Sequence, residues 1–323
     1  MDYKLAFFIL IGIIGFLIIS SLVGVPILFW YISGIVYKNT ALPTKTHDWG
    51  RHCSDPGDYE MMVMWEQGLQ WEKENHQCKK EVKIHNDGCD LVGEYFDFGS
   101  DKTVILIAGR LESLMYSYYF AEPFKKANLN VLCIDKRGHG LSSGGEVEDF
   151  GQVGWVDIIA WAKFIHEEYH CNDITLHGIC IGGTAGVYAI SNEECPTYIK
   201  RIIVDSLYKN LYNNFYFHMK QERRPTFLIT RFIMKRIGKV HHQDYINDGP
   251  YKQIKKVKKP ILFIYSQEDV FAPPEDAKIV MDNCASEHKK IALFPTGRHS
   301  HVRINHQEEY DKAIIDFLKQ ENN

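Results

Sequence analysis

A cysteine flanked by glycines is the residue of this chain best suited to covalent chemistry. It lies in the segment Gly178-Ile179-Cys180-Ile181-Gly182-Gly183, directly after a short apolar run at residues 174–176. Glycines on both sides of a central residue are typical of a nucleophile elbow, a strained strand-to-helix turn in which larger side chains would collide. We therefore predict that Cys180 is a nucleophile for acyl chemistry and that Gly178, Gly182 and Gly183 form the turn around it.

Such a nucleophile needs a base to accept its proton and an acid to orient that base. On folds with a nucleophile elbow the chain order is nucleophile, acid, histidine. Two downstream segments fit this order, because the strand-like run 261–265 leads to Asp269 and the run 291–294 leads to His299. We predict that Asp269 is the acid and that His299 is the base.

Both assignments have alternatives. Glu268 and Asp205 also follow strand-like runs, and a turn or a helix cap explains a carboxylate such as Asp269 without any catalytic role. His301 stands two residues beyond His299 in the same loop.

Acyl chemistry also places negative charge on a carbonyl oxygen, which two backbone amides normally stabilise. The residue after the nucleophile supplies one, so we predict the Ile181 N–H, at the start of a helix whose dipole adds to the effect. For the second amide we predict the Arg110 N–H, in a turn after an earlier strand. An ordinary turn explains Gly109 equally well.

The elements that position these residues follow an alternating pattern from about residue 80 onward. Short apolar runs alternate with segments of helical periodicity, which predicts an α/β fold with a mostly parallel sheet covered on both faces. Ligands bind such sheets beyond the carboxyl ends of the strands, where Cys180 is expected. The predicted strands are 82–84, 91–98, 104–107, 131–134, 174–176, 202–204, 261–265 and 291–294, and the predicted helices are 115–127, 156–168, 184–190, 274–283 and 307–318.

An aromatic and basic insertion at residues 209–259 interrupts this alternation and predicts a helical lid over the site. An ordinary amphipathic cap with a solvated charged face remains an alternative to a lipid-binding surface. Basic residues on a tethered protein gain attraction to anionic headgroups. The basic residues in the aromatic part of the insertion are Lys220, Arg223, Arg224, Arg231, Lys235, Arg236 and Lys239.

The N-terminal stretch has no charged side chain from Leu5 to Tyr37. A membrane span needs roughly 20 apolar residues, whereas a signal peptide has a core of about 7–15 followed by a processing site. We therefore predict a transmembrane anchor at residues 1–37, with Trp30 at an interface. A linker and a juxtamembrane helix at residues 38–79 would join it to a hydrolase core formed by residues 80–208 and 260–323.

Charge and cysteine usage bear on location and partners. Lys4 and the amino terminus precede the predicted span, and Lys38, Lys45 and Arg51 follow it. Because positive charges are enriched on the cytoplasmic side of a span, this count favours a cytoplasmic globular part. The net charge of -4 and the lack of a nucleic-acid-binding signature argue against nucleic acid as a partner. The eight scattered cysteines include no C-x-x-C pair, so we expect free thiols and neither a metal nor an organic cofactor.

These motifs resemble the α/β-hydrolase superfamily, in its monoacylglycerol lipase, lysophospholipase and serine aminopeptidase-like branch, over about residues 80–320. Residues 135–142 are similar to the D-x-R-G-H-G-x-S loop of that branch, and residues 269–273 to its acid turn. Residues 204–206 resemble a strand that ends in a structural aspartate, which weighs against Asp205 as the acid.

The chain departs from that branch at two places. Ala108-Gly109 stands where His-Gly is usual, and Cys180 replaces serine. Cysteine is found at this position in dienelactone hydrolases and polyhydroxyalkanoate synthases, and residues 178–184 resemble the lipase box of the synthases. A thiol beside an imidazole is a ready nucleophile, but a thiolate is also a good leaving group, which favours activated esters, thioesters and acyl transfer.

We predict a membrane-anchored hydrolase that cleaves esters or thioesters of apolar, lipid-like acyl groups through an acyl-enzyme. Acyl transfer to an alcohol or thiol remains an alternative, as does a non-catalytic tethered binding protein that kept the fold. The sequence indicates neither the headgroup and chain length of the substrate nor the oligomeric state.

Overall fold

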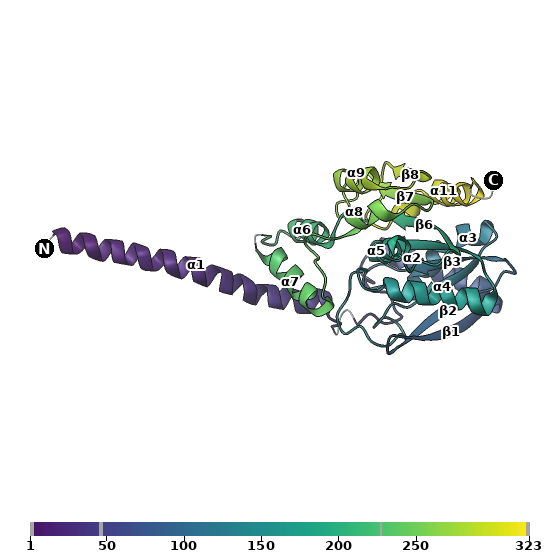
Figure 1. Cartoon of the computed structure of the whole chain (residues 1–323), viewed down its shortest axis with the longest axis horizontal. Helices are drawn as coiled ribbons and strands as arrows, with labels where there is room; N and C mark the ends of the chain where they lie inside the picture. Colours follow the sequence, from purple (N-terminus) through teal and green to yellow (C-terminus); the bar gives the residue numbers. More distant parts are fainter. Residues whose placement is uncertain (1–2, 45–47, 227, 321–323) are drawn as a thin grey trace.

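The structure of the chain is a computed structural model that describes residues 3–44, 48–226 and 228–320. Lys45, one of the charges that follow the predicted anchor, lies outside these residues. A long helix, α1 (Tyr3–Ala41), projects from an α/β domain that contains the rest of the described chain (Figure 1).

Eight strands of the described residues form one sheet in the order β1-β2-β4-β3-β5-β6-β7-β8. β2 pairs antiparallel with both β1 and β4, and the strands from β4 across to β8 are parallel. The eight predicted strands are therefore all present. Their bounds are β1 (Lys79–Asn86), β2 (Cys89–Phe96), β3 (Lys102–Ile107), β4 (Asn130–Ile134), β5 (Asp173–Ile179), β6 (Ile199–Asp205), β7 (Ile261–Ser266) and β8 (Lys289–Phe294).

Helices cover both faces of this sheet, as its continuous apolar strands predict. Every residue of the central strand β4 is buried. α3 (Glu122–Lys126) packs on α11 (Gln307–Gln320), which follows the one-turn helix α10 (Val302–Asn305). In a second layer each helix contacts the next: α4 (Trp155–Tyr169), α5 (Ile181–Ser191), α8 (Pro250–Gln253) and α9 (Pro274–Asn283).

The helix predicted at residues 115–127 is wrong as a single element. The chain instead forms a 3₁₀ segment, η2 (Leu114–Phe120), followed by the short helix α3. Pro123 explains the break, because it has no N–H to donate and its ring would clash with the preceding turn of a continuous helix. It is tolerated in the first turn of α3. Two further 3₁₀ turns, η1 (His76–Cys78) and η3 (Ile254–Lys256), precede β1 and β7.

The N-terminal half of α1 stands clear of the domain. Its most apolar 18-residue window has a mean hydropathy of 2.8 and no buried residue. Near the end of the helix this changes, because Ser33 and Ala41 are completely buried against the domain. One face of the last third of α1 is therefore part of the domain's packing.

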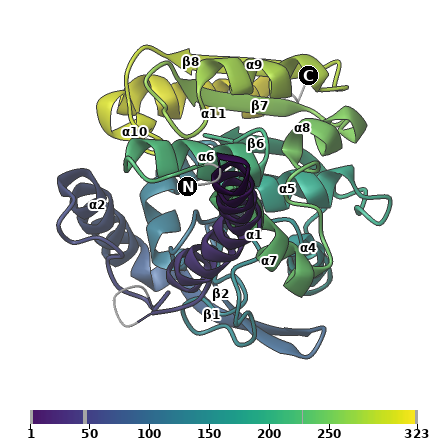
Figure 2. The ribbon, with the colours of Figure 1, turned by 90° about the vertical axis from the view of Figure 1, so that its left-hand side faces the viewer.

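α7 (Ile229–His241) lies beside the end of α1, whereas α2 (Tyr59–Asn75) lies to one side of the domain (Figure 2). α2 is capped by Asp58, whose side chain accepts hydrogen bonds from two amides of the first turn. It packs on η2 and donates from Trp71 Nε1 to Glu122, so it lies on the domain. α6 (Leu211–Gln221) and α7 stand between β6 and β7, and we call residues 211–241 the cap.

Candidate active site

Cys180 occupies a strained turn between β5 and α5. Its φ of 52° and ψ of -112° lie in a region that non-glycine residues rarely adopt. The flanking glycines are required by close backbone approach, because a Cβ atom on Gly178 would lie 2.3 Å from the Gly182 oxygen, and one on Gly182 would lie 2.2 Å from the Ile107 oxygen. At Gly183 it would lie 3.1 Å from the Gly178 oxygen. The turn therefore has the geometry of a nucleophile elbow.

Backbone hydrogen bonds fix this turn against its neighbours. The Cys180 amide donates to the Asp205 carbonyl oxygen at 2.9 Å, and the Cys180 carbonyl accepts from the Thr184 amide at 3.1 Å. The cysteine is 8% exposed, so its sulfur lies in a largely enclosed place.

Asp269 and His299 form a direct pair beyond β7 and β8. His299 Nδ1 lies 3.0 Å from Asp269 Oδ1 and 2.8 Å from Oδ2. Oδ1 also accepts from the amides of Phe271 and Ala272, both at 2.8 Å. Burial raises the pKa of Asp269, but the imidazole and the two amides outweigh this effect and hold the pKa below its ordinary value. The carboxylate is thus built to remain ionised and to hold the histidine.

The second nitrogen of His299 faces the cysteine. His299 Nε2 is buried and has no hydrogen-bond partner of ordinary geometry among the described residues. Burial lowers the pKa of His299, but the Asp269 carboxylate and the Cys180 sulfur together raise the pKa well above its ordinary value. The structure thus brings Cys180, Asp269 and His299 together beyond the carboxyl ends of β5, β7 and β8.

The alternatives to these residues are held elsewhere. Asp205 is buried and accepts from the hydroxyls of Ser206 and Tyr310, both at 2.8 Å. Glu268 accepts from the Gly297 amide at 3.1 Å. His301 Nδ1 lies 2.7 Å from Glu60 of α2.

One predicted oxyanion donor, Ile181, is the first residue of α5, and the other, Arg110, lies in the loop after β3. Neither the Ile181 amide nor the Arg110 amide donates to another residue in the part of the chain that the structure describes. The Arg110 loop is held on both sides of Gly109, whose amide donates to Glu112 Oε2 and whose carbonyl accepts from Lys136 Nζ, each at 2.7 Å. These contacts hold the Arg110 turn in place.

Glu112 was not found from the sequence. Burial raises the pKa of this carboxyl to about 7, although the Gly109 amide, Lys136 and His299 act in the opposite direction. In the sequence, Glu112 is marked only by its position three residues after Gly109. Many surface turns have the same spacing, so it does not indicate a buried carboxyl.

The cap covers the site from the side of α6. The His218 ring stacks on Phe271 with 3.6 Å between centroids, and Phe271 meets the His299 ring edge-on at 5.7 Å. The Arg110 guanidinium lies 5.8 Å from the centre of the Phe215 ring and donates to the Thr40 carbonyl at 2.9 Å. Burial first, then Arg110 and His299, lowers the pKa of His218 to about 3, so this imidazole is neutral.

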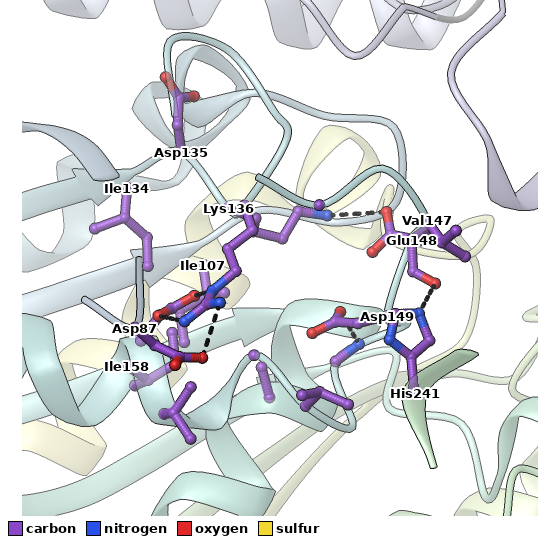
Figure 3. A pocket seen from close by; sticks show the side chains of 18 of the residues that line it. Asp87, Ile107, Ile134, Asp135, Lys136, Val147, Glu148, Asp149, Ile158 and His241 are labelled. Atoms are coloured by element: carbon purple, nitrogen blue, oxygen red, sulfur yellow. Dashed lines mark hydrogen bonds and ion pairs between the residues drawn. The ribbon is translucent and has the colours of Figure 1, made fainter. Parts of the chain in front are cut away.

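A separate cavity of about 390 Å³ is lined in part by the loop at residues 145–154 (Figure 3). Its walls come from the ends of β3 and β4, the start of α4 and the end of α7, and they include none of Cys180, Asp269 and His299. Its charged groups are mostly paired: Arg137 binds Asp157 at 2.6 Å, and Lys136 lies 3.6 Å from Glu148. This cavity is therefore distinct from the place where the three predicted catalytic residues meet.

Comparison with known proteins agrees with this architecture. A profile of the family described as serine aminopeptidase, S33, matches residues 99–211. The uncharacterized protein YqkD of Bacillus subtilis is 24% identical over 238 residues, which are 72% of this chain and 76% of that protein. The uncharacterized membrane protein YNL320W of Saccharomyces cerevisiae is 22% identical over 309 residues, 94% of this chain and 95% of that one.

The fold also matches solved structures. A Pyrococcus furiosus esterase, Pf2001, superposes with a TM-score of 0.65 at 22% identity and covers 77% of this chain and 93% of its own. The predicted fold is therefore confirmed, including the eight-stranded sheet and the long apolar N-terminal helix. The chain has the α/β-hydrolase fold, and its residues 99–211 match the profile of the family described as serine aminopeptidase, S33.

Proposed function

We propose that the chain is a membrane-anchored hydrolase of esters or thioesters with apolar acyl groups. In this proposal Cys180 is the nucleophile, His299 the base and Asp269 the acid that orients the base. One observation carries it: both Asp269 oxygens hold His299 Nδ1, while the buried Nε2 is left without a described partner beside the elbow cysteine. This is the arrangement that a base needs in order to accept a proton from a nucleophile.

The reaction would proceed in two halves. His299 Nε2 accepts the thiol proton while the sulfur attacks the substrate carbonyl carbon, and the amides of Ile181 and Arg110 stabilise the resulting oxyanion. Collapse breaks the bond to the alcohol or thiol, which leaves with the proton from His299, and gives an acyl-cysteine. Water then gives a proton to His299 and attacks the acyl carbon. The free acid leaves, and the proton returns to the sulfur.

The ester or thioester class follows from the nucleophile and from the fold relatives. A thiolate is itself a good leaving group, so its tetrahedral adduct returns to substrate unless the other leaving group departs easily. Activated esters and thioesters meet this condition better than amides. The Pyrococcus furiosus relative is named an esterase, which supports an ester substrate.

Membrane anchoring is supported by α1 and by one relative. The stretch of α1 from Tyr3 to Leu28 is about 39 Å long, compared with roughly 30 Å for the hydrocarbon core of a bilayer. The yeast relative is named a membrane protein, and its match covers 94% of this chain. The cytoplasmic orientation of the domain remains a prediction from the charges beside the anchor.

A second candidate is transfer of the acyl group to an alcohol or thiol instead of water. The observation that favours it is the enclosure of Cys180, which is 8% exposed. An acyl-cysteine shielded from water persists until an acceptor arrives. Reactions run with added glycerol would yield a new ester in this case and the free acid in the case of hydrolysis.

Steady-state kinetics on the full chain in detergent tests the proposal, with p-nitrophenyl butyrate and an acyl thioester as substrates. We expect Cys180→Ala to lower kcat/KM by about 10⁴-fold or more. Cys180→Ser should keep more activity on the oxyester than on the thioester. Cys171→Ala, which removes another buried thiol, is the matched control and should leave both rates unchanged. Retention of more than a tenth of the activity in Cys180→Ala would refute this assignment.

A further inference from the structure

The cap concentrates positive charge in a short segment. Residues 211–241 contain seven lysines and arginines and a single acidic residue, Glu222. In the part of the cap that the structure describes, one ion pair is formed, between Arg224 and Glu222 at 2.7 Å. The side chains that face solvent are those of Lys220, Arg223, Arg224, Arg231, Lys235 and Lys239. This surface is therefore strongly basic and almost unneutralised.

The cap helix α7 runs beside α1 in the same direction. Phe232 meets Trp30 with 5.7 Å between ring centroids. One turn later, the Arg236 guanidinium stacks 3.7 Å from the Trp30 ring and donates to Ser33 Oγ at 3.1 Å. These contacts fix the register of the two helices.

The far end of α7 agrees with this register. His241 lies 3.2 Å from the Glu148 carbonyl, and the Glu148 amide donates to the Ala41 carbonyl at 2.8 Å. Residues 232–241 therefore accompany residues 30–41 of α1, and the α6–α7 connection lies on the side toward the free part of α1. Figure 1 shows this connection at the end of the domain from which α1 projects.

This register places the basic residues at the level of a membrane surface. The free part of α1 is long enough to cross the hydrocarbon core, so the headgroup region begins close to where α1 meets the domain. Trp30 is 45% exposed at this level and is a residue type that favours the interface. Residues 220–226 and 228–231, which we call the cap tip, lie on the membrane side of Phe232.

We propose that the cap tip docks on an anionic bilayer surface, with Arg223, Arg224 and Arg231 against lipid phosphate and carboxylate groups. The occupant is the bilayer that α1 would cross, because the contacts between α7 and α1 hold the tip on the side toward the free part of α1. Docking fixes the cap relative to the membrane, and α6 leads from the tip to His218 beside the site. The proposal goes beyond hydrolysis and rests on anchoring by α1, not on the chemistry at Cys180.

Hydrogen exchange followed by mass spectrometry tests this proposal on the full chain in lipid nanodiscs. One set of discs contains phosphatidylcholine alone, and the other contains 30% phosphatidylserine. Each basic residue near an anionic surface contributes roughly fivefold to binding. We therefore expect peptides that cover residues 220–231 to exchange about tenfold or more slowly in the anionic discs. High salt should remove this protection, because the charges are screened.

Two variants sharpen the test. Arg223→Gln/Arg224→Gln/Arg231→Gln should abolish the protection, whereas Lys255→Gln/Lys256→Gln/Lys258→Gln should keep it. The control removes three exposed charges that precede β7, at the opposite end of that strand from Asp269. Equal exchange in both kinds of disc, or protection that survives the triple arginine substitution, would overturn the proposal. A chain that does not co-purify with the discs would overturn the anchoring on which it rests. An enzyme inactive on esters would still show the protection, so the two proposals fail separately.

Discussion

Replacement of Asp269 by asparagine separates an orienting carboxylate from a merely structural one. The Phe271 and Ala272 amides both donate to Oδ1, so the oxygen of the new amide stays at that position. Its NH₂ group then occupies the Oδ2 position, which is the nearer of the two to His299 Nδ1, at 2.8 Å compared with 3.0 Å for Oδ1. Because the NH₂ group donates, Nδ1 becomes an acceptor and the ring proton moves to Nε2. The imidazole can then no longer accept a proton from Cys180.

The structure also gives the size of the effect. In the proposed mechanism the Asp269 carboxylate stabilises the imidazolium that forms during the reaction, and its removal leaves that charge buried. At 2.8 Å and an effective dielectric constant of about 20, the lost interaction is roughly 6 kcal/mol. This corresponds to a decrease of about 10⁴-fold in kcat/KM.

The assay is the initial rate of p-nitrophenyl ester hydrolysis by the full chain, with circular dichroism to show that the variant folds. Glu268→Gln is the matched control, because Glu268 is the exposed neighbour and its one backbone hydrogen bond, from Gly297, survives the change. We expect the control to keep wild-type activity. A folded Asp269→Asn protein with more than a tenth of the wild-type rate would refute the reasoning, as would an equal loss in the control.

Three further predictions concern the scaffold of the site. Gly178→Ala, which places a Cβ atom 2.3 Å from a carbonyl oxygen, should destabilise the fold by about 1–3 kcal/mol and lower activity, and an unchanged melting temperature would contradict the elbow geometry. Arg51→Ala leaves the buried Asp135 carboxylate without its cation and should lower the free energy of unfolding by about 3–5 kcal/mol. Its control is Arg224→Ala, which removes an exposed ion pair and should lower the free energy of unfolding by less than about 1 kcal/mol. Because burial raises the pKa of Glu112 to about 7 in the folded state, this residue lowers wild-type stability as pH rises from about 4.5 to 7. Chemical unfolding measures the free energy of unfolding of both proteins. Between about pH 4.5 and 7, that of Glu112→Gln should rise by roughly 3 kcal/mol relative to that of wild type, and a difference that does not change with pH would exclude this effect.

The fold was predictable because its signals are local. Most central strands contain a continuous apolar run, as in residues 131–134, and buried parallel strands have this composition. The elbow was predictable for a different reason, since only glycine fits at positions 178 and 182. The pairing of His299 with Asp269 stays a prediction as to its catalytic role, although the two side chains are in contact.

The features that the sequence did not indicate depend on contacts between distant segments. The segment between α1 and α2 looked like a polar linker, yet Arg51 binds Asp135 and Glu94, both at 2.9 Å, and Trp49 stacks on His139. Glu112 and His218 were missed because nothing local distinguishes them from surface residues. Their burial depends on how loops from different strands meet, and no periodicity in the sequence encodes this.

Intact-mass analysis of the full chain after brief incubation with an acyl thioester tests the central claim most directly. The account predicts a mass increase of one acyl group that maps to the peptide containing Cys180, disappears as substrate is consumed, and is absent from Cys180→Ala. Continued turnover with the acyl group on another residue, or with no covalent adduct under any quench, would contradict it.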